Sequence, residues 1–443
     1  MIANISVEIF SYNSFEKGRR SPCKRLTIKG KLKSRFKEWI KMGLLNAPFQ
    51  LSLNTDLKFG YHVVQQELAD KINASGKKKA FIITDKGLID SGVVQTIADA
   101  LEAKKVDYVV YSDVEPNPSA HSVMTGVKSF HLEQADLIVA LGGGSSMDYA
   151  KALAVAATHP GFVLDYTLGG KPIEDKLPLI FAIPTTIGTG SEVTLASVIT
   201  DTDAGRKLIL ASPLLIPKAV FVDPSLTLGL PRKHVAATGS DALVHAIEAY
   251  VSLPANPFSD ALALQAIRMI WDNLPQTYAH EGNLEARAQV HLASTFAGLS
   301  FNSGGLGLVH SLSHPMSARY QVPHGIANAV ILPHIIEHNI AANPQKYADI
   351  ARMIDPSLSY ESHAKSAKTL ISLVRDFLQS IDIPASFDFI NKEFSADDIE
   401  QLAEDAMNDH GTVHNNPRRA VKEDIVQIYK KVLPVRKDAK VFN

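Results

Sequence analysis

The feature that most constrains the fold of this chain is a change of pattern near residue 235. Between about residues 52 and 234, short and mostly apolar runs alternate with amphipathic segments. The clearest runs lie at 80–84, 106–110, 137–141 and 179–183, with helical segments at 91–103 and near 122–132. Apolar strands separated by helices are typical of a parallel sheet covered on both faces. Beyond residue 235 only long segments of helical periodicity follow, at 240–252, 259–273, 285–300 and 364–380. We therefore predict an α/β domain at 52–234 and an all-helical domain at 235–443.

The composition excludes several classes of protein. A hydrophobic content of 46% with 21% charged residues is that of a globular protein, and the formal net charge of -1 provides no overall field that would attract nucleic acid. No apolar run approaches the ~20 residues needed to cross a bilayer. Cys23 is the only cysteine, which excludes an internal disulfide and any metal site built on several thiolates. We expect a cytoplasmic protein without a nucleic-acid partner.

Residues 1–51 form a basic N-terminal extension. Residues 1–50 contain eleven Lys or Arg and three Glu, a net charge of about +8. Four apolar residues recur there at helical spacing among basic ones, namely Leu32, Phe36, Trp39 and Ile40. This pattern predicts a short basic amphipathic helix. A surface helix packed on the main body is the simplest interpretation. The alternatives are a weak contact with a membrane surface or a partner, a transit peptide, and a wrongly assigned start.

Two glycine-rich loops follow predicted strands. Gly142-Gly143-Gly144-Ser145 lies between a strand and a helix, where the backbone can approach a pyrophosphate and the helix N-terminus attracts its charge. Residues 183–192 form a second loop, rich in glycine and hydroxyl groups. Open parallel sheets bind ligands at the carboxyl ends of their strands, so both loops are candidates for nucleotide binding.

Asp85 also follows a predicted strand. A carboxylate in that position can accept hydrogen bonds from the adenosine ribose of NAD, and it would repel the additional phosphate of NADP. Tight structural turns explain the glycine cluster and Asp85 equally well without a ligand, and this alternative stays open.

Five residues of the second half indicate a metal site. Asp241 and His245 are four apart on a predicted helix, so their side chains project from one face and can bind one divalent cation. His310, His314 and His324 gather within fifteen residues, two of them in apolar surroundings where unpaired imidazoles are costly. A surface ion pair or a core histidine explains each residue taken singly, but explains the group poorly.

Several spaced motifs resemble the iron-containing (group III) alcohol dehydrogenases over about residues 52–443. The matching segments are GGGSSMDYAK at 142–151, IPTTIGTGSEVT at 183–194, GSDALVHAIEAY at 239–250, GLGLVHSLSHP…VPHG between 305 and 325 and, more weakly, NNPRR at 415–419. The resemblance implies a dehydroquinate synthase-like architecture. In that architecture a Rossmann-like nucleotide-binding domain precedes a helical metal-binding domain, and the active site lies between them.

The resemblance also assigns individual residues. Position by position, it implies metal ligands at Asp241, His245, His310 and His324, and a catalytic histidine near the nicotinamide at His314. The cofactor contacts that it implies are Asp85, Asn117, Gly143, Gly144, Thr185, Thr189, Thr194 and Lys207.

The activity implied is that of an NAD-dependent, Fe²⁺-dependent dehydrogenase. It would interconvert a small primary alcohol or diol and the corresponding aldehyde, as a homodimer or a larger homo-oligomer. Ligand chemistry alone would also admit Zn²⁺, because zinc binds nitrogen and oxygen ligands more tightly than iron in the usual order. The alternatives are a glycerol-dehydrogenase-like polyol oxidoreductase and a non-catalytic nucleotide-binding protein.

Overall fold

The structure is a computed structural model that describes residue 49 and residues 55–174 and 176–436. The amphipathic helix predicted in the basic extension lies outside the described residues. Residues 50–443 group into one compact unit. Among the described residues, no helix combines the length and the apolarity that crossing a membrane would require.

A parallel sheet organises the first half of this unit. Six of the described strands pair in the order β1-β8-β5-β4-β2-β3. They are β1 (Asp56–Phe59), β2 (Lys79–Ile83), β3 (Asp107–Tyr111), β4 (Leu137–Gly142), β5 (Leu179–Pro184) and β8 (Ala219–Val222). The four strands predicted from apolar runs are confirmed to within one residue at each end. The central strand β4 is buried along its whole length, which explains why its sequence is continuously apolar.

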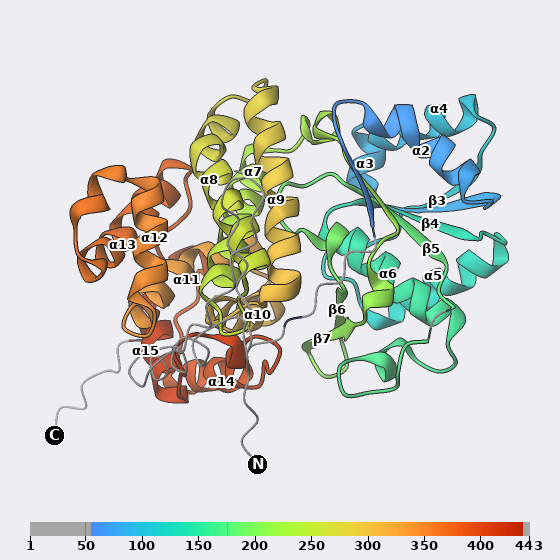
Figure 1. Cartoon of the computed structure of the whole chain (residues 1–443). Coiled ribbons are helices and arrows are strands. Elements are labelled where there is room, and N and C mark those ends of the chain that lie inside the picture. The colour runs from blue at the N-terminus through green and yellow to red at the C-terminus, as the bar shows by residue number, and fades with distance from the viewer. Residues whose placement is uncertain (1–48, 50–54, 175, 437–443) are drawn as a thin grey trace, which may run out of the picture. The chain divides into compact units, whose positions relative to one another are not determined.

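Helices cover both faces of this sheet (Figure 1). They are α2 (Val63–Ala74), α3 (Lys86–Asp90), α4 (Val93–Ala103), α5 (Ala120–Leu132) and α6 (Gly144–Thr158). Helices α2 and α4 form one apolar layer with the sheet, and α5 and α6 form the other. The helix predicted at 91–103 begins later than expected, because Gly92 has a φ of +79° and separates α3 from α4.

An antiparallel hairpin follows the fifth strand and was not predicted. It consists of β6 (Ala196–Asp201) and β7 (Arg206–Ala211), which pair with each other. Short 3₁₀ helices flank these elements at η2 (Val163–Tyr166), η3 (Ser191–Val193), η4 (Pro213–Leu215) and η5 (Pro224–Thr227).

The second half is helical, as predicted. Its helices are α7 (Arg232–Val251), α8 (Pro257–Ala279), α9 (Leu284–Gly304), α10 (Leu308–Tyr320), α11 (His324–Asn339), α12 (Pro344–Ile354), α13 (His363–Ser380), α14 (Ala396–Met407) and α15 (Lys422–Val432). The short helices η6 (Pro356–Tyr360), η7 (Asp388–Ile390) and η8 (Val413–Asn415) connect them. Helix α7 is buried on nearly every side and lies among α8, α9 and α11. A polar side chain on α7 is therefore shielded from solvent.

Candidate metal centre and cofactor cleft

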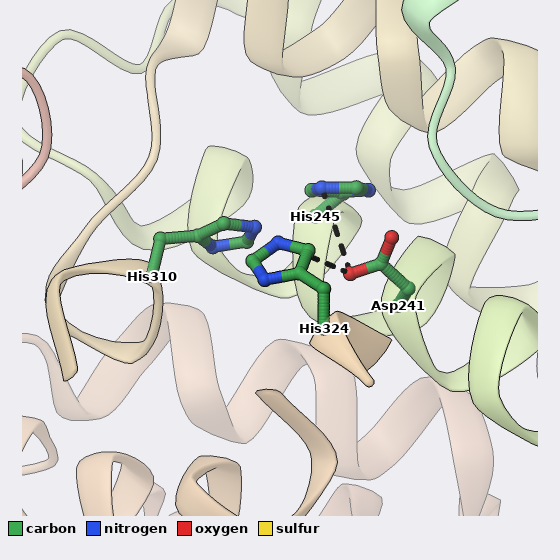
Figure 2. A group of neighbouring side chains, drawn as sticks. All are labelled: Asp241, His245, His310 and His324. Atoms are coloured by element: carbon green, nitrogen blue, oxygen red, sulfur yellow. Dashed lines mark ion pairs between the residues drawn. The ribbon is translucent and has the colours of Figure 1, made fainter. Parts of the chain in front are cut away.

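Three helices bring the four predicted metal ligands together. Asp241 and His245 stand one turn apart on α7, His310 lies in α10, and His324 is the first residue of α11. Figure 2 shows the three imidazole rings and the carboxylate facing a common centre. Each residue offers one ligand atom, and these atoms all lie within 4.8 Å of one another. Nε2 of His245 and Nε2 of His324 are 3.8 and 3.9 Å from Oδ1 of Asp241.

The imidazoles of this cluster are in the state that metal binding requires. Burial lowers the pKa of His245 to about 4 and that of His310 to about 3. Burial also holds the pKa of His324 well below its usual value, with the neighbouring histidines adding to the effect. All three rings are therefore neutral at pH 7, and each can offer a nitrogen lone pair.

Hydrogen bonds orient two of the rings. His310 Nδ1 lies 2.6 Å from Oε2 of Glu248, a carboxylate that also accepts the backbone N–H groups of Gly307 and Val309. Burial raises the pKa of Glu248 to about 7, against the opposing effect of these two N–H groups. His245 Nδ1 lies 3.3 Å from the carbonyl oxygen of Gly188. Partners of this kind fix the tautomer of a ligating histidine, leaving Nε2 free for the metal.

A buried amide lies against the same centre. Asn328 Nδ2 is 2.7 Å from Asp241 Oδ1 and 3.2 Å from Nε2 of both His310 and His324. Asn328 Nδ2 therefore lies next to the centre toward which the four side chains point. The shortest of the three contacts is the hydrogen bond that Asn328 donates to Asp241, and it fixes the orientation of that carboxylate.

The donor set fits a divalent cation. Three neutral imidazoles and one carboxylate converge, with Asp241, His245 and His310 buried and His324 partly buried, and second partners orient two of the rings. Without a cation, the two N–H groups of the Asn328 amide cannot satisfy all the acceptor atoms gathered here, which is an unfavourable arrangement inside a protein. Asp241, His245, His310 and His324 are thus able to hold such an ion.

His314 lies beside this group without joining it. Its ring stacks on that of His324, with 5.3 Å between the centroids, while its Nδ1 is 2.7 Å from Oδ2 of Asp409. Burial pushes the pKa of Asp409 upward, but His314, the Thr412 hydroxyl and His310 together outweigh this effect and hold the pKa below its usual value. His314 and Lys207 both line a cavity of about 440 Å³, which we call the His314 cavity. It lies among the β6–β7 hairpin, α10 and the end of α14.

The two predicted phosphate loops pack against each other. Strands β4 and β5 are neighbours, with Gly142 paired to Pro184, so both loops start at the same level of the sheet. A Cβ atom on Gly143 would lie 2.9 Å from the Thr186 side chain, and one on Gly144 would lie 2.9 Å from the Thr189 side chain. The absence of side chains therefore permits this close packing at the start of α6.

Comparisons with known proteins agree over nearly all the described residues. A sequence model described as iron-containing alcohol dehydrogenase matches residues 54–224, and one for the C-terminal part of the same family matches residues 235–433. The chain belongs to the iron-containing alcohol dehydrogenase family. It is therefore an oxidoreductase enzyme.

Individual relatives of this dehydrogenase are similar over almost their whole length. The 1,3-propanediol dehydrogenase of Klebsiella pneumoniae is 39% identical over 365 residues, which are 82% of this chain and 93% of the relative. The NAD-dependent methanol dehydrogenase of Bacillus methanolicus is 37% identical, covering 83% of this chain and 96% of the relative. The solved structure of a 1,3-propanediol oxidoreductase superimposes with a TM-score of 0.83 at 37% identity, covering 87% of this chain and 99% of the other.

The remaining predicted cofactor contacts of the dehydrogenase lie in segments that follow the parallel strands and in the β6–β7 hairpin. Asn117 and Lys207 are joined by a hydrogen bond of 2.8 Å from Nζ to Oδ1, although 90 residues separate them. Thr185 follows β5, and its N–H donates to the carbonyl oxygen of Gly142. Thr194 is buried next to the β6–β7 hairpin. Asp85 accepts the N–H of Leu88 and caps α3, so the structural role considered for it from sequence is present. The contacts of these residues with NAD stay predictions.

Sequence reasoning missed several residues of the site. Glu248 lies seven residues after Asp241 on α7, and Asn328 lies four after His324 on α11. Helical spacing places both on the faces that carry the ligands, and this signal could have found them. Asp409 offers no such signal, because it is 95 residues from His314 in the chain.

Proposed function

We propose that this enzyme uses NAD and a divalent metal, Fe²⁺ by preference, to interconvert a small primary alcohol or diol and the corresponding aldehyde. The observation that supports the proposal most directly is the convergence of three neutral imidazoles and one carboxylate next to His314 and Lys207. A metal centre that adjoins a cavity beside a nucleotide-binding edge suits hydride transfer between cofactor and substrate.

The cofactor would lie along the carboxyl edge of the sheet. The start of α6 presents backbone N–H groups to the pyrophosphate, and Gly143 and Gly144 allow its close approach. Asp85 would accept hydrogen bonds from the hydroxyl groups of the adenosine ribose. Its negative charge would repel the additional phosphate of NADP, which favours NAD. Thr194 and the Asn117–Lys207 pair would receive the nicotinamide half.

Asp241, His245, His310 and His324 would hold the metal. When bound there, a divalent cation supplies Lewis acidity that polarises the oxygen of the alcohol or aldehyde. The relatives' family description supports Fe²⁺, whereas the ligand types themselves would also accept Zn²⁺.

His314 would transfer the proton of the alcohol. Its Nδ1 is engaged by Asp409, so its Nε2 is the nitrogen left to exchange a proton with substrate. The ring lines the His314 cavity, which gives it a route to solvent. A neutral imidazole nitrogen can take the proton of the alcohol during oxidation and return it during reduction.

The activities for which two relatives are named support short alcohols and diols. The compared proteins are named for 1,3-propanediol and methanol. We include a homodimer or larger homo-oligomer in the proposal, which light scattering on the purified protein would test.

A substrate panel tests the proposal. Protein loaded anaerobically with Fe²⁺ or with Zn²⁺ is offered methanol, ethanol, 1,3-propanediol and glycerol with NAD or NADP, and nicotinamide reduction is followed by absorbance. We expect the highest turnover with Fe²⁺, NAD and a primary alcohol or 1,3-propanediol. Turnover with glycerol alone would favour a polyol oxidoreductase, and no turnover with any pair would contradict the proposal.

A further inference from the structure

Lys151 is a fully buried lysine that lies outside the metal centre. It belongs to α6, and none of its surface is exposed. Its Nζ donates to three backbone carbonyl oxygens, at 2.7 Å to Ser191, 2.9 Å to Thr194 and 2.8 Å to Ala196. An ammonium group has three N–H donors, so these carbonyls satisfy all of them.

The charge of this ammonium is balanced locally. Burial lowers the pKa of Lys151 to about 8, while the carboxylates of Asp148 and Glu192 oppose that shift. The charged form therefore prevails at pH 7. Hydrogen bonds to a charged donor are stronger than those between neutral groups, so the six residues 191–196 are firmly bound to α6.

The 191–196 segment is held from its other side by α9. Thr295 donates to the Glu192 carboxylate at 2.7 Å, and the side-chain oxygen of Asn302 accepts the N–H of Leu195 at 2.9 Å. The segment thus links the helix that starts at the phosphate loop to a helix of the metal-binding half.

This segment also precedes the hairpin that carries Lys207. Thr194 lies within it, and β6 begins at Ala196. Since β6 and β7 pair residue by residue, with Thr200 opposite Lys207, a shift at the start of β6 would move the Lys207 backbone. The backbone that Lys151 binds therefore carries Thr194 and leads into the strand pair that carries Lys207, the two groups proposed to bind the nicotinamide half.

We propose that Lys151 is a positioning residue of the cofactor cleft. By binding the backbone of the 191–196 segment, it sets the place of Thr194 and Lys207 relative to the phosphate loop, so that both halves of NAD are bound at once. The inference rests on the proposed use of NAD.

Separate titrations of NADH and ADP test this role. ADP carries the adenosine and both phosphates but lacks the nicotinamide half, so it reports only on the loops near Gly143. Lys151→Met removes the ammonium and keeps a side chain of similar length. We expect the NADH dissociation constant to rise about tenfold or more, since small displacements of positioned groups have effects of this size. The ADP constant and the metal content should stay unchanged. Lys128→Met, at an exposed lysine of α5, is the matched control.

The outcomes are distinguishable. Equal weakening of NADH and ADP indicates general damage to the domain, and unchanged NADH binding indicates that the lysine positions nothing; either result overturns the inference. If Lys151→Met does not fold, Ser191→Ala provides a milder form of the comparison, because it removes the side-chain contacts of 3.1 Å to Lys151 and 2.9 Å to Asp148 and keeps the three backbone contacts. A smaller but still selective loss of NADH affinity is expected there. Wild-type protein that binds no NADH would instead contradict the proposed use of NAD.

Discussion

Nδ1 of His310 lies 2.6 Å from Oε2 of Glu248, while Nε2 of the same ring faces Asn328 beside Asp241. The two nitrogens therefore have different tasks. With the hydrogen on Nδ1, the ring donates to the carboxylate, and Nε2 keeps its lone pair for the proposed cation. Glu248 stands on the same helix as Asp241 and His245, so α7 supplies two of the proposed ligands and the residue that orients a third.

The role of Glu248 predicts a change in metal affinity. Glu248→Gln replaces the carboxylate by an amide of the same shape, which weakens its hold on His310. We expect the dissociation constant for Fe²⁺, or for Co²⁺ as a stable substitute, to rise about 10- to 100-fold. Equilibrium dialysis measures it, with Glu281→Gln at an exposed position as control. Wild-type affinity in the Glu248 variant would show that this hydrogen bond does not support the metal.

Asp85 has two separable roles, and one substitution distinguishes them. Asp85→Asn retains the cap of α3, because Asn and Asp are comparable N-cap residues, but it removes the negative charge. We expect the preference for NAD over NADP, measured as the ratio of kcat/KM values, to decrease while the thermal stability is kept. If Asp85→Asn leaves the preference intact, the residue is only a cap and cofactor choice is made elsewhere.

His334 predicts a pH dependence of stability that is independent of the metal centre. It lies on α11, and burial lowers its pKa to about 4, with Arg375 and Lys431 adding to the effect. The unfolded chain binds this proton near pH 6.5 and the folded one only near pH 4. The contribution of His334 to the free energy of unfolding is therefore at its full value above about pH 6.5. It decreases as the pH falls from 6.5 toward 4, because the unfolded chain binds the proton and the folded chain does not.

Denaturant unfolding curves between pH 6 and pH 4.5 check this dependence. One proton bound preferentially by the unfolded state corresponds to about 1 kcal/mol per pH unit. The free energy of unfolding of His334→Gln should therefore decline less steeply than that of wild type, by about that amount. His363→Gln, at an exposed position, is the control. Equal slopes for all three proteins would refute the effect of burial at His334.

The sequence predicted those parts of the fold whose patterns are local. Continuous apolar runs located β4 and β5, because strands covered on both faces contain few polar residues. The β6–β7 hairpin was missed. Its strands are only partly buried, and the apolar run of β7, Leu208 to Ala211, follows two basic residues instead of filling the strand. The boundary between α3 and α4 depends on the positive φ of Gly92, and helical periodicity alone does not report it.

The same distinction applies to the site. Asp241 and His245 could be paired from their spacing on one helix. The place of His310 and His324 next to them came from the family resemblance, because the packing of α10 and α11 against α7 has no signature in the spacing of residues. Contacts such as His314 with Asp409 and Lys151 with the 191–196 backbone join distant segments, and only the folded chain shows them.

The metal content of His310→Ala and His314→Ala, measured beside their turnover, tests the central claim most directly. Both variants remove one imidazole from α10, but only His310 belongs to the four convergent residues proposed to hold the metal. We predict that His310→Ala retains neither stoichiometric metal nor NAD-linked alcohol oxidation. His314→Ala should bind metal like wild type, with turnover reduced about 10²- to 10⁴-fold through loss of proton transfer. Normal metal loading and normal turnover in His310→Ala would contradict the account.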